Sequence, residues 1–192
     1  MPEPNPEALR FLRTRRSRPA KTLRAPAPDR AAVMELLTIA ARSPDHGKLE
    51  PWRFIVLGRG ALDRFAGLVR AHGARLGKSE RDIDKQVSAY ADSPLAVVVV
   101  SAPKPSDEVP EIEQRLSAGA VCLSLLNAAL ACGWGANWLT GWPVHDAGFR
   151  AEALGLEGAE RVTGVIHIGT ETRTPPERPR PDVAALTSWL EA

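Results

Sequence analysis

Cysteine and histidine are both scarce in this sequence, which has two cysteines and four histidines among its 192 residues. Cys122 and Cys132 fall within one apolar segment that we expect to be helical, and ten residues of helix span about 15 Å. A disulfide needs Cα atoms closer than about 7 Å, so we expect two free, buried cysteines, as in a reducing compartment. No second histidine or cysteine stands at ligand spacing from His46, and the sequence therefore predicts no metal site.

A large charge of either sign is also absent, because 25 basic side chains nearly cancel 23 acidic ones and leave a net charge of +2. This balance argues against a nucleic-acid surface, although basic residues gather in Arg10–Arg24 and Arg173–Arg180, where they suit a small anion. The chain opens without a signal-like apolar segment, and its longest apolar stretch is interrupted by Ser124 and Asn127. We therefore expect a cytoplasmic protein that binds neither nucleic acid nor a membrane.

Several common site motifs are missing too, since the sequence has no Walker loop and no GxGxxG, HExxH or GxSxG element. Phosphate binding by the first two devices is therefore excluded. What the chain does have is 44% hydrophobic residues, which at this length suit one domain with one core, over residues 1–192.

The clearest strand is Leu95–Ser101, a β-branched run that is apolar on both faces and so indicates a central strand covered by helices. Apolar spacing, capping residues and turn signals predict the other elements. Helices are expected at Asn5–Arg15, Asp29–Ala41, Ala61–Leu76, Ser79–Tyr90 and Glu111–Ala131, and strands at Arg53–Leu57, within 133–140 and within 161–169. An extended arm rich in proline and arginine is expected from about residue 171, with a short helix after it.

The second half of the helix expected at Glu111–Ala131 is apolar almost all round instead of along one stripe. Such a helix must be buried on every side. In a chain of this size it lies at the centre of the monomer or at the seam of a dimer, and we favour a share of both.

Three segments carry residue types that suit a ligand. The first is Arg15, Arg16, Ser17 and Arg18 at a helix end, where arginine forks and a hydroxyl match phosphate oxygens. The alternative is that these cations offset the negative end of the helix dipole.

The second segment is the loop RSPDHGKLEPW at 42–52, whose glycine and prolines bend the backbone so that polar groups converge. On its own, His46 is more typical of an ordinary loop histidine than of a catalytic one. The third segment is GWGANWLTGWP at 133–143, which offers glycines for close backbone approach and tryptophans for stacking. Core aromatics beside structural glycines are the alternative there.

Taken in order, RRSR, RSPDHGKLEPW, the long apolar helix ending in GWGANWLTG, and the late strand IHIGT resemble the nitroreductase family. The resemblance is closest to the short YdjA-like branch, and it spans Arg15 to Thr170. Each motif is weak alone, but four in this order are specific for the family and its FMN. They are far less specific for a substrate.

The resemblance implies an α+β fold, with a central mixed sheet covered by helices on both faces, and a homodimer with two identical FMN sites. It places Arg15, Arg16 and Ser17 at the phosphate and ribityl end of FMN, and Arg42 and His46 against the flavin from the neighbouring chain. The remaining assignments are a lining of the flavin ring (Trp138, Leu139, Thr140), an amide toward flavin N5 (Gly141) and a nicotinamide-binding stretch (Ala128, Ala129, Leu130, Ala131, Cys132, Gly133).

The implied activity is hydride transfer from NADH or NADPH to a small electron-poor acceptor, such as a nitroaromatic or a quinone, by a ping-pong mechanism. The flavin does the chemistry, so no side chain is expected to be catalytic. A cation near N1 and O2 of the ring favours hydride uptake, and Arg42 and Lys48 are the candidates for it.

Two positions depart from the family pattern. Glu50 stands where many members have glutamine, and the C-terminal basic residue that often completes the phosphate site stays open among Arg173, Arg178 and Arg180. Because fold and cofactor do not fix the substrate, reductive dehalogenation, enoate reduction and flavin breakdown are alternative reactions. A non-catalytic adaptor that uses the cluster Arg15–Arg24 is the alternative from another class.

Overall fold

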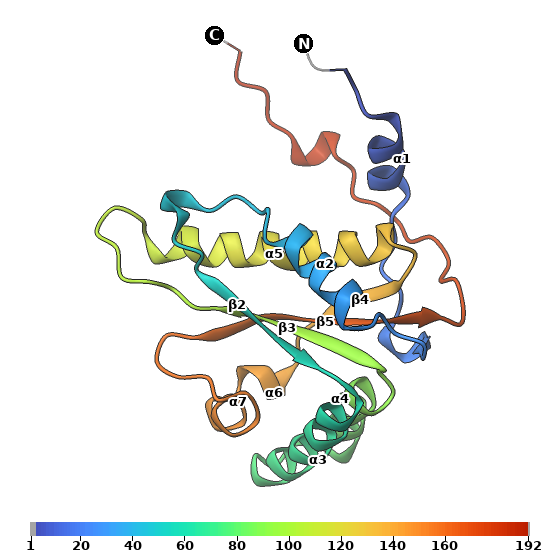
Figure 1. Cartoon of the computed structure of the whole chain (residues 1–192), viewed down its shortest axis with the longest axis vertical. Coiled ribbons are helices and arrows are strands. Elements are labelled where there is room, and N and C mark those ends of the chain that lie inside the picture. The colour runs from blue at the N-terminus through green and yellow to red at the C-terminus, as the bar shows by residue number, and fades with distance from the viewer. Residues whose placement is uncertain (1–2, 192) are drawn as a thin grey trace.

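A five-stranded sheet forms the centre of the computed structural model, which describes residues 3–191. The strand order is β1-β5-β3-β2, and β4 also pairs with β5. The strands are β1 (Leu23–Arg24), β2 (Trp52–Leu57), β3 (Leu95–Ser101), β4 (Gly135–Leu139) and β5 (Arg161–Glu171). As Figure 1 shows, the sheet lies between two layers of helices, which confirms the expected α+β architecture.

Helices α2 and α5 cover one face of this sheet, and α3, α4, α6 and α7 cover the other (Figure 1). Each face has its own cluster of buried side chains, and β3 contributes alternate residues to both. The helices are α1 (Pro6–Thr14), α2 (Arg30–Ala40), α3 (Arg59–Arg75), α4 (Glu80–Ala91), α5 (Glu111–Ala131), α6 (Trp142–His145) and α7 (Ala147–Leu154).

The sheet is antiparallel at each described pairing, and the expectation of a mixed sheet was wrong in this respect. The connection between β2 and β3 explains the first of these pairings. Two helices, α3 and α4, join the strands, so the chain leaves the end of β2 and returns to the same end of the sheet. Leu57 therefore faces Ala96 across the ladder, whereas a parallel pair needs a crossover to the opposite end.

Local sequence signals account for most of the element boundaries. Asn5 caps α1 by accepting a hydrogen bond from the backbone N–H of Ala8 (3.0 Å), and Asp29 caps α2 in the same way. Strand β3 has the predicted bounds and is buried along its whole length, as a strand covered on both faces must be. Helix α5 also has its predicted bounds.

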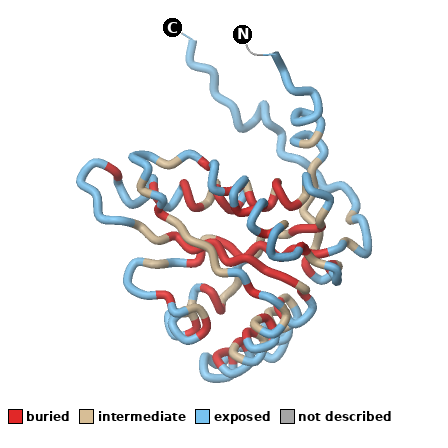
Figure 2. Tube along the Cα trace, viewed as in Figure 1, coloured by how far each residue is buried: buried red, intermediate tan, exposed pale blue. Residues whose placement is uncertain are grey.

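Within one chain, helix α5 is buried on one side and exposed on the other (Figure 2). Val121 and Leu125 are fully buried against the sheet, but Ile112, Leu116 and Leu123 are exposed along the outer face.

One correction concerns the cysteines, which were both expected to be buried. Both are free, but Cys132 is exposed because it lies just beyond the C-terminal end of α5, where the helix leaves the core.

Strand β1 and helices α6 and α7 were missed from the sequence. Two residues are too few to show a period, and α6 spans a single turn. Helix α7 did carry signals, because Asp146 caps its first turn and Gly155 ends it with φ +62°. The buried imidazole of His72 in α3 lies 2.7 Å from the carboxylate of Glu152 in α7, and this contact holds α7 against α3.

Both ends of the described chain project from the body on the α5 side of the sheet (Figures 1 and 2). Beyond Glu171 the chain runs as an irregular arm with one 3-10 turn at Ala184–Leu186, which matches the expected arm and short helix. This arm exposes four large apolar side chains, namely Val183, Leu186, Trp189 and Leu190. Among residues 3–191, no helix combines the length and hydropathy that crossing a membrane requires.

Two glycine substitutions test how closely the side chains of the sheet are packed. A Cβ added at Gly164 of β5 would lie 2.1 Å from Nε1 of Trp138, whereas one added at Gly67 in α3 would meet nothing within 4 Å. We expect Gly164→Ala to lower the free energy of unfolding by about 1–3 kcal/mol through overpacking. The control Gly67→Ala should raise it by about 0.5–1 kcal/mol, since alanine loses less backbone entropy in a helix. Urea unfolding of both variants checks the pair, and equal effects would contradict it.

Candidate functional site

The segment Arg15–Arg18 lies along β4, where Arg18 donates its backbone N–H to the carbonyl of Ala136 (2.8 Å). Ser17 holds the two preceding arginines in place. Arg15 donates to the Ser17 hydroxyl (3.2 Å), and Arg16 donates to the Ser17 carbonyl (3.3 Å). Arg18 is neutralised by an ion pair with Glu171 at 2.5 Å. The structure thus brings the predicted residues together, with Arg15 and Arg16 lacking an acidic partner within 4 Å among the described residues.

The side chains of Arg15 and Arg16 are poorly satisfied where they stand. Their Nε atoms are both buried without a hydrogen-bond partner in the described part of the chain. Burial lowers the pKa of Arg15, and the neighbouring charges of Arg180 and Arg16 lower it further. An anion beside these side chains would satisfy the unused donors and would offset the repulsion between the neighbouring positive charges.

The pKa shift of Arg15 also shows which arginine of the C-terminal arm lies near it. Arg180 is close enough to Arg15 to depress its pKa, and it pairs with Glu177 at 2.7 Å. Arg173 and Arg178 have no such effect on Arg15. A hollow of about 260 Å³ opens beside the cluster and is lined by Phe11, Thr14, Arg15, Arg16, Arg18, Leu130, Gly133, Trp134, Gly135 and Glu171.

The loop from Arg42 to Trp52 is tied to α5 by four hydrogen bonds, one of which runs from Trp52 Nε1 to the Ser117 hydroxyl (3.2 Å). Ser43 and Ser124 share a hydrogen bond of 3.0 Å, and the Ser117 hydroxyl donates to the Pro44 carbonyl (2.7 Å). His46 Nδ1 lies 2.7 Å from a carboxylate oxygen of Glu113. The predicted site histidine is therefore held through Nδ1, which leaves Nε2 on its outer side.

Backbone strain marks the same loop. Gly47, Lys48 and Glu50 all have positive φ, at +71°, +53° and +49°. Lysine and glutamate rarely adopt this region, and such residues persist where the surroundings over-determine them. The Glu50 N–H donates to the Asp45 carboxylate at 2.6 Å, which helps to hold the turn.

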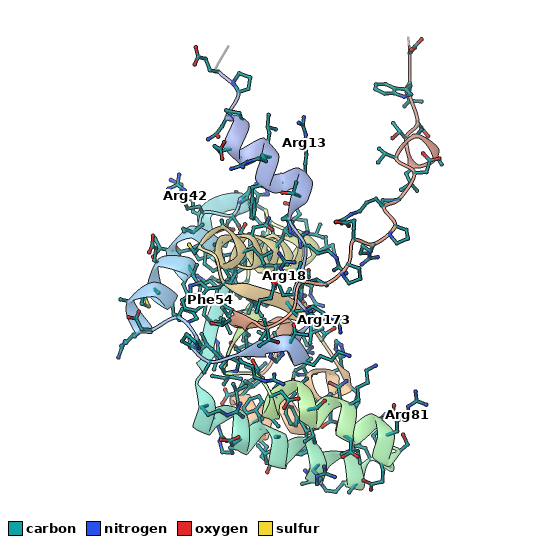
Figure 3. The ribbon with its side chains drawn as sticks, turned by 90° about the vertical axis from the view of Figure 1, so that its right-hand side faces the viewer. Arg13, Arg18, Arg42, Phe54, Arg81 and Arg173 are labelled. Carbon is teal, nitrogen blue, oxygen red and sulfur yellow. The ribbon has the colours of Figure 1, made fainter. Side chains whose placement is uncertain are left out.

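Arg42 lies in a different hollow from Arg15. It lines a space of about 390 Å³ with residues of α1, α2 and α5, among them Ala128 and Ala131, and with Cys132 just beyond α5. Figure 3 shows Arg42 pointing outward from the end of α2, apart from Arg18. Leu130 and Gly133 line the hollow beside Arg15, whereas Ala129 is fully buried in the core. The predicted nicotinamide stretch is thus divided between two surfaces and the interior.

A cavity of about 200 Å³ lies between α4 and the strands β4 and β5. Leu139 and Thr140, which were predicted, line it together with residues that the sequence analysis missed. Its complete lining is Lys85, Gln86, Ala89, Tyr90, Leu139, Thr140, Val165 and His167. His167 did carry a signal, because it is the single ionisable residue within the apolar run VIHI of β5.

The neighbouring glycine and tryptophan of the predicted ring site have structural roles. A Cβ at Gly141 would clash with the amide end of Gln86, so a larger residue here would displace that side chain. Trp138 pairs with Ile166 in the sheet and packs with it on the α2–α5 face. Leu139 pairs with Val165 and faces the other side. Trp138 and Leu139 therefore point in opposite directions, and the predicted flavin contacts of Trp138 and Gly141 stay predictions.

His167 and Tyr90 are the buried titratable groups of this cavity. Burial lowers the pKa of His167 to about 4, so the imidazole is neutral near pH 7. Burial also raises the pKa of the Tyr90 hydroxyl and keeps it protonated. The ring centroids of the two residues are 5.8 Å apart. Within residues 3–191, no group of three His, Cys, Asp or Glu side chains is arranged to hold a metal ion.

Comparisons with known proteins agree with this arrangement. A sequence model of the Nitroreductase family matches residues 12–170. The chain is 32% identical over 164 residues to the Escherichia coli protein named "Putative NAD(P)H nitroreductase YdjA", covering 85% of this chain and 88% of that protein. It is 35% identical over 165 residues to the Haemophilus influenzae "Putative NAD(P)H nitroreductase", with the same coverage.

A solved structure from Desulfovibrio desulfuricans, described as a "putative nitroreductase in complex with fmn", superposes with a TM-score of 0.73. It is 23% identical in sequence and covers 99% of this chain and 100% of its own. This likeness shows the fold. The sequence matches show more, and the chain belongs to the nitroreductase family, which is a family of oxidoreductases.

The low pKa of His167 predicts an acid-sensitive core. Between pH 6.5 and pH 4 the unfolded chain binds a proton at this residue that the folded chain does not, so stability falls as the pH falls. The free energy of unfolding of the parent should drop by up to about 1.4 kcal/mol per pH unit more than that of His167→Phe. Urea unfolding without added ligand at pH 7 and pH 5 measures the difference, and parallel pH dependences would refute the assignment.

Proposed function

We propose that this protein is an FMN-dependent oxidoreductase that passes hydride from NADH or NADPH to a small electron-poor acceptor, such as a nitroaromatic or a quinone. Membership of the family supports this function, as do the names of the bacterial relatives and the FMN complex of the Desulfovibrio protein. The observation that carries the proposal is the arginine cluster, in which buried Nε atoms of Arg15 and Arg16 have no partner.

The phosphate of FMN fits this cluster. A phosphate monoester is a dianion near pH 7, and arginine forks bind its oxygens in pairs. Arg15 and Arg16 supply unused donors, and the Ser17 hydroxyl stands 3.2 Å from an Arg15 nitrogen. Arg180, which pairs with Glu177, is the arginine of the arm whose charge acts on Arg15. An anion here would also relieve the repulsion between Arg15 and Arg16. Arg180 is therefore our choice for the C-terminal residue of the phosphate site.

The cavity beside Thr140 supplies donors suited to the polar edge of a flavin ring. Lys85 and Gln86 face it from α4, and neither side chain has a hydrogen bond or ion pair with another residue in the described chain. When bound, FMN supplies the centre that takes hydride from the nicotinamide and passes it to the acceptor. Lys85 would stabilise negative charge at the ring edge, and it joins Arg42 and Lys48 as a candidate for that cation.

We also propose a homodimer. Ile112, Leu116 and Leu123 form an exposed apolar stripe along α5, and the C-terminal arm exposes Trp189 and Leu190 beyond the body of the chain. An uncovered apolar surface of this kind suits an interface between two copies. Such an interface would also explain how Arg42, which lies apart from Arg15 within one chain, could serve a shared site.

Purification tests the proposal as a whole. We expect yellow protein with the native mass of two chains and about one FMN per chain, because each chain carries one arginine cluster. Reduction of a nitroaromatic or quinone should depend on added NADH or NADPH. Absorption spectroscopy, a native mass measurement and a steady-state assay check the three parts. A colourless preparation that takes up no added FMN would rule out the flavin function.

Arginine variants test the phosphate site. Arg15→Ala and Arg180→Ala each remove one charged donor, and each should lose roughly 1.5–3 kcal/mol, or about tenfold to more than a hundredfold in FMN affinity. Arg173→Ala is the matched control, since it removes an arginine of the same arm and should bind FMN like the parent. Fluorescence titration of the apoproteins measures all three. If Arg173→Ala weakens binding and Arg180→Ala does not, the choice of Arg180 was wrong.

A further inference from the structure

His167 stands in an unusual place for a histidine. It is 1% exposed in the middle of β5, between the fully buried residues Ile166 and Ile168. Its Nδ1 atom is buried without a hydrogen-bond partner in the described chain. Burying a polar group unpaired carries a stability cost, and native proteins rarely keep such a group without a reason.

The packing around His167 does not supply that reason. Across the sheet it pairs with Ala96 on one side and with Asn137 on the other, and neither side chain bonds to it. The ring of Tyr90 lies at 5.8 Å between centroids and offers a tilted aromatic contact that phenylalanine or leucine could also make. An apolar residue of similar shape would therefore fill this position equally well.

The cavity explains the histidine better than the core does. His167 lines it on the strand side, while Lys85, Gln86 and Thr140 line it from the opposite side and the end of β4. None of these four side chains makes a hydrogen bond or ion pair with another residue in 3–191. Lys85 and Thr140 are exposed and Gln86 is half-buried, so water reaches them, whereas the buried Nδ1 atom of His167 has no partner. A polar ligand in this cavity would meet three free polar side chains and would satisfy the buried nitrogen.

We propose that His167 is a positioning residue for the flavin ring, forming the missing hydrogen bond with the ring's polar edge, either directly or through one water. This inference rests on the proposed FMN function. Hydride uptake adds negative charge to the ring, so a hydrogen bond from the imidazole strengthens as the flavin is reduced. His167 thus favours the reduced flavin while Arg15 and Arg180 hold the other end of the cofactor.

Two variants separate this role from a packing role. His167→Phe keeps a planar ring of similar size and removes the polar atoms, whereas His167→Gln keeps polar atoms in a smaller side chain. We expect His167→Phe apoprotein to melt at the same temperature as the parent or higher, since an unpaired polar group has been removed. Its FMN affinity should nevertheless fall about three- to tenfold. His167→Gln should recover most of that loss.

The redox potential of bound flavin is a second readout. If the reduced flavin loses tenfold more affinity than the oxidised flavin in His167→Phe, the midpoint potential falls by about 30 mV for this two-electron couple. A spectroelectrochemical titration of the parent and both variants measures the shift. A purely structural histidine would change the melting temperature and leave the potential and the FMN affinity where they were.

The outcomes distinguish this inference from the proposed function. If the parent takes up no FMN, both are overturned. If the parent binds FMN and His167→Phe matches it in affinity and potential, this inference alone is overturned. Should His167→Phe fail to fold, His167→Leu, which also removes the polar ring atoms, takes its place. Loss of FMN affinity and a lower potential in His167→Leu, with His167→Gln close to the parent, would support the inference, and unchanged values would refute it.

Discussion

Backbone pairing of β5 is the constraint on which the rest of the structure depends. This strand pairs with β1, β3 and β4, so its register sets which residues of those strands lie next to one another. Pairing with β4 brings the segment after α1 to the sheet, because Arg18 bonds to the backbone of Ala136. The strand then ends at Glu171, from which the arm carries Arg180 back toward Arg15. Arginines that lie 165 positions apart in sequence (180 − 15) come near each other in this way.

The candidate site contains buried polar atoms that have no hydrogen-bond partner. Arg15 and Arg16 keep buried Nε atoms without partners, and His167 keeps a buried ring nitrogen without one. Each deficit lowers the stability of the free chain, and each is relieved by a ligand of the complementary chemistry. The arginine cluster and the cavity around His167 flank the same strand, β4, so one elongated cofactor with a phosphate end and a polar ring could contact both.

Helix α5 connects the core to the site. Its inner face packs against the sheet through Leu125, and its polar residues hold the strained loop through the contacts Ser117–Pro44 and Glu113–His46. The outer face carries exposed apolar residues such as Leu116. The loop keeps left-handed Lys48 and Glu50 because these tethers over-determine its shape.

Local patterns in the sequence determined the caps at Asn5 and Asp29, the buried strand β3, the bounds of α5 and, through motif order, the family. These features depend on residues a few positions apart, so periodicity and composition report them. Only the tertiary structure decided that the sheet is antiparallel, that Trp138 faces the α2–α5 side of it, and that Arg180 lies near Arg15. The cavity around His167 belongs with these, because strand register and helix packing bring together residues that no local pattern connects.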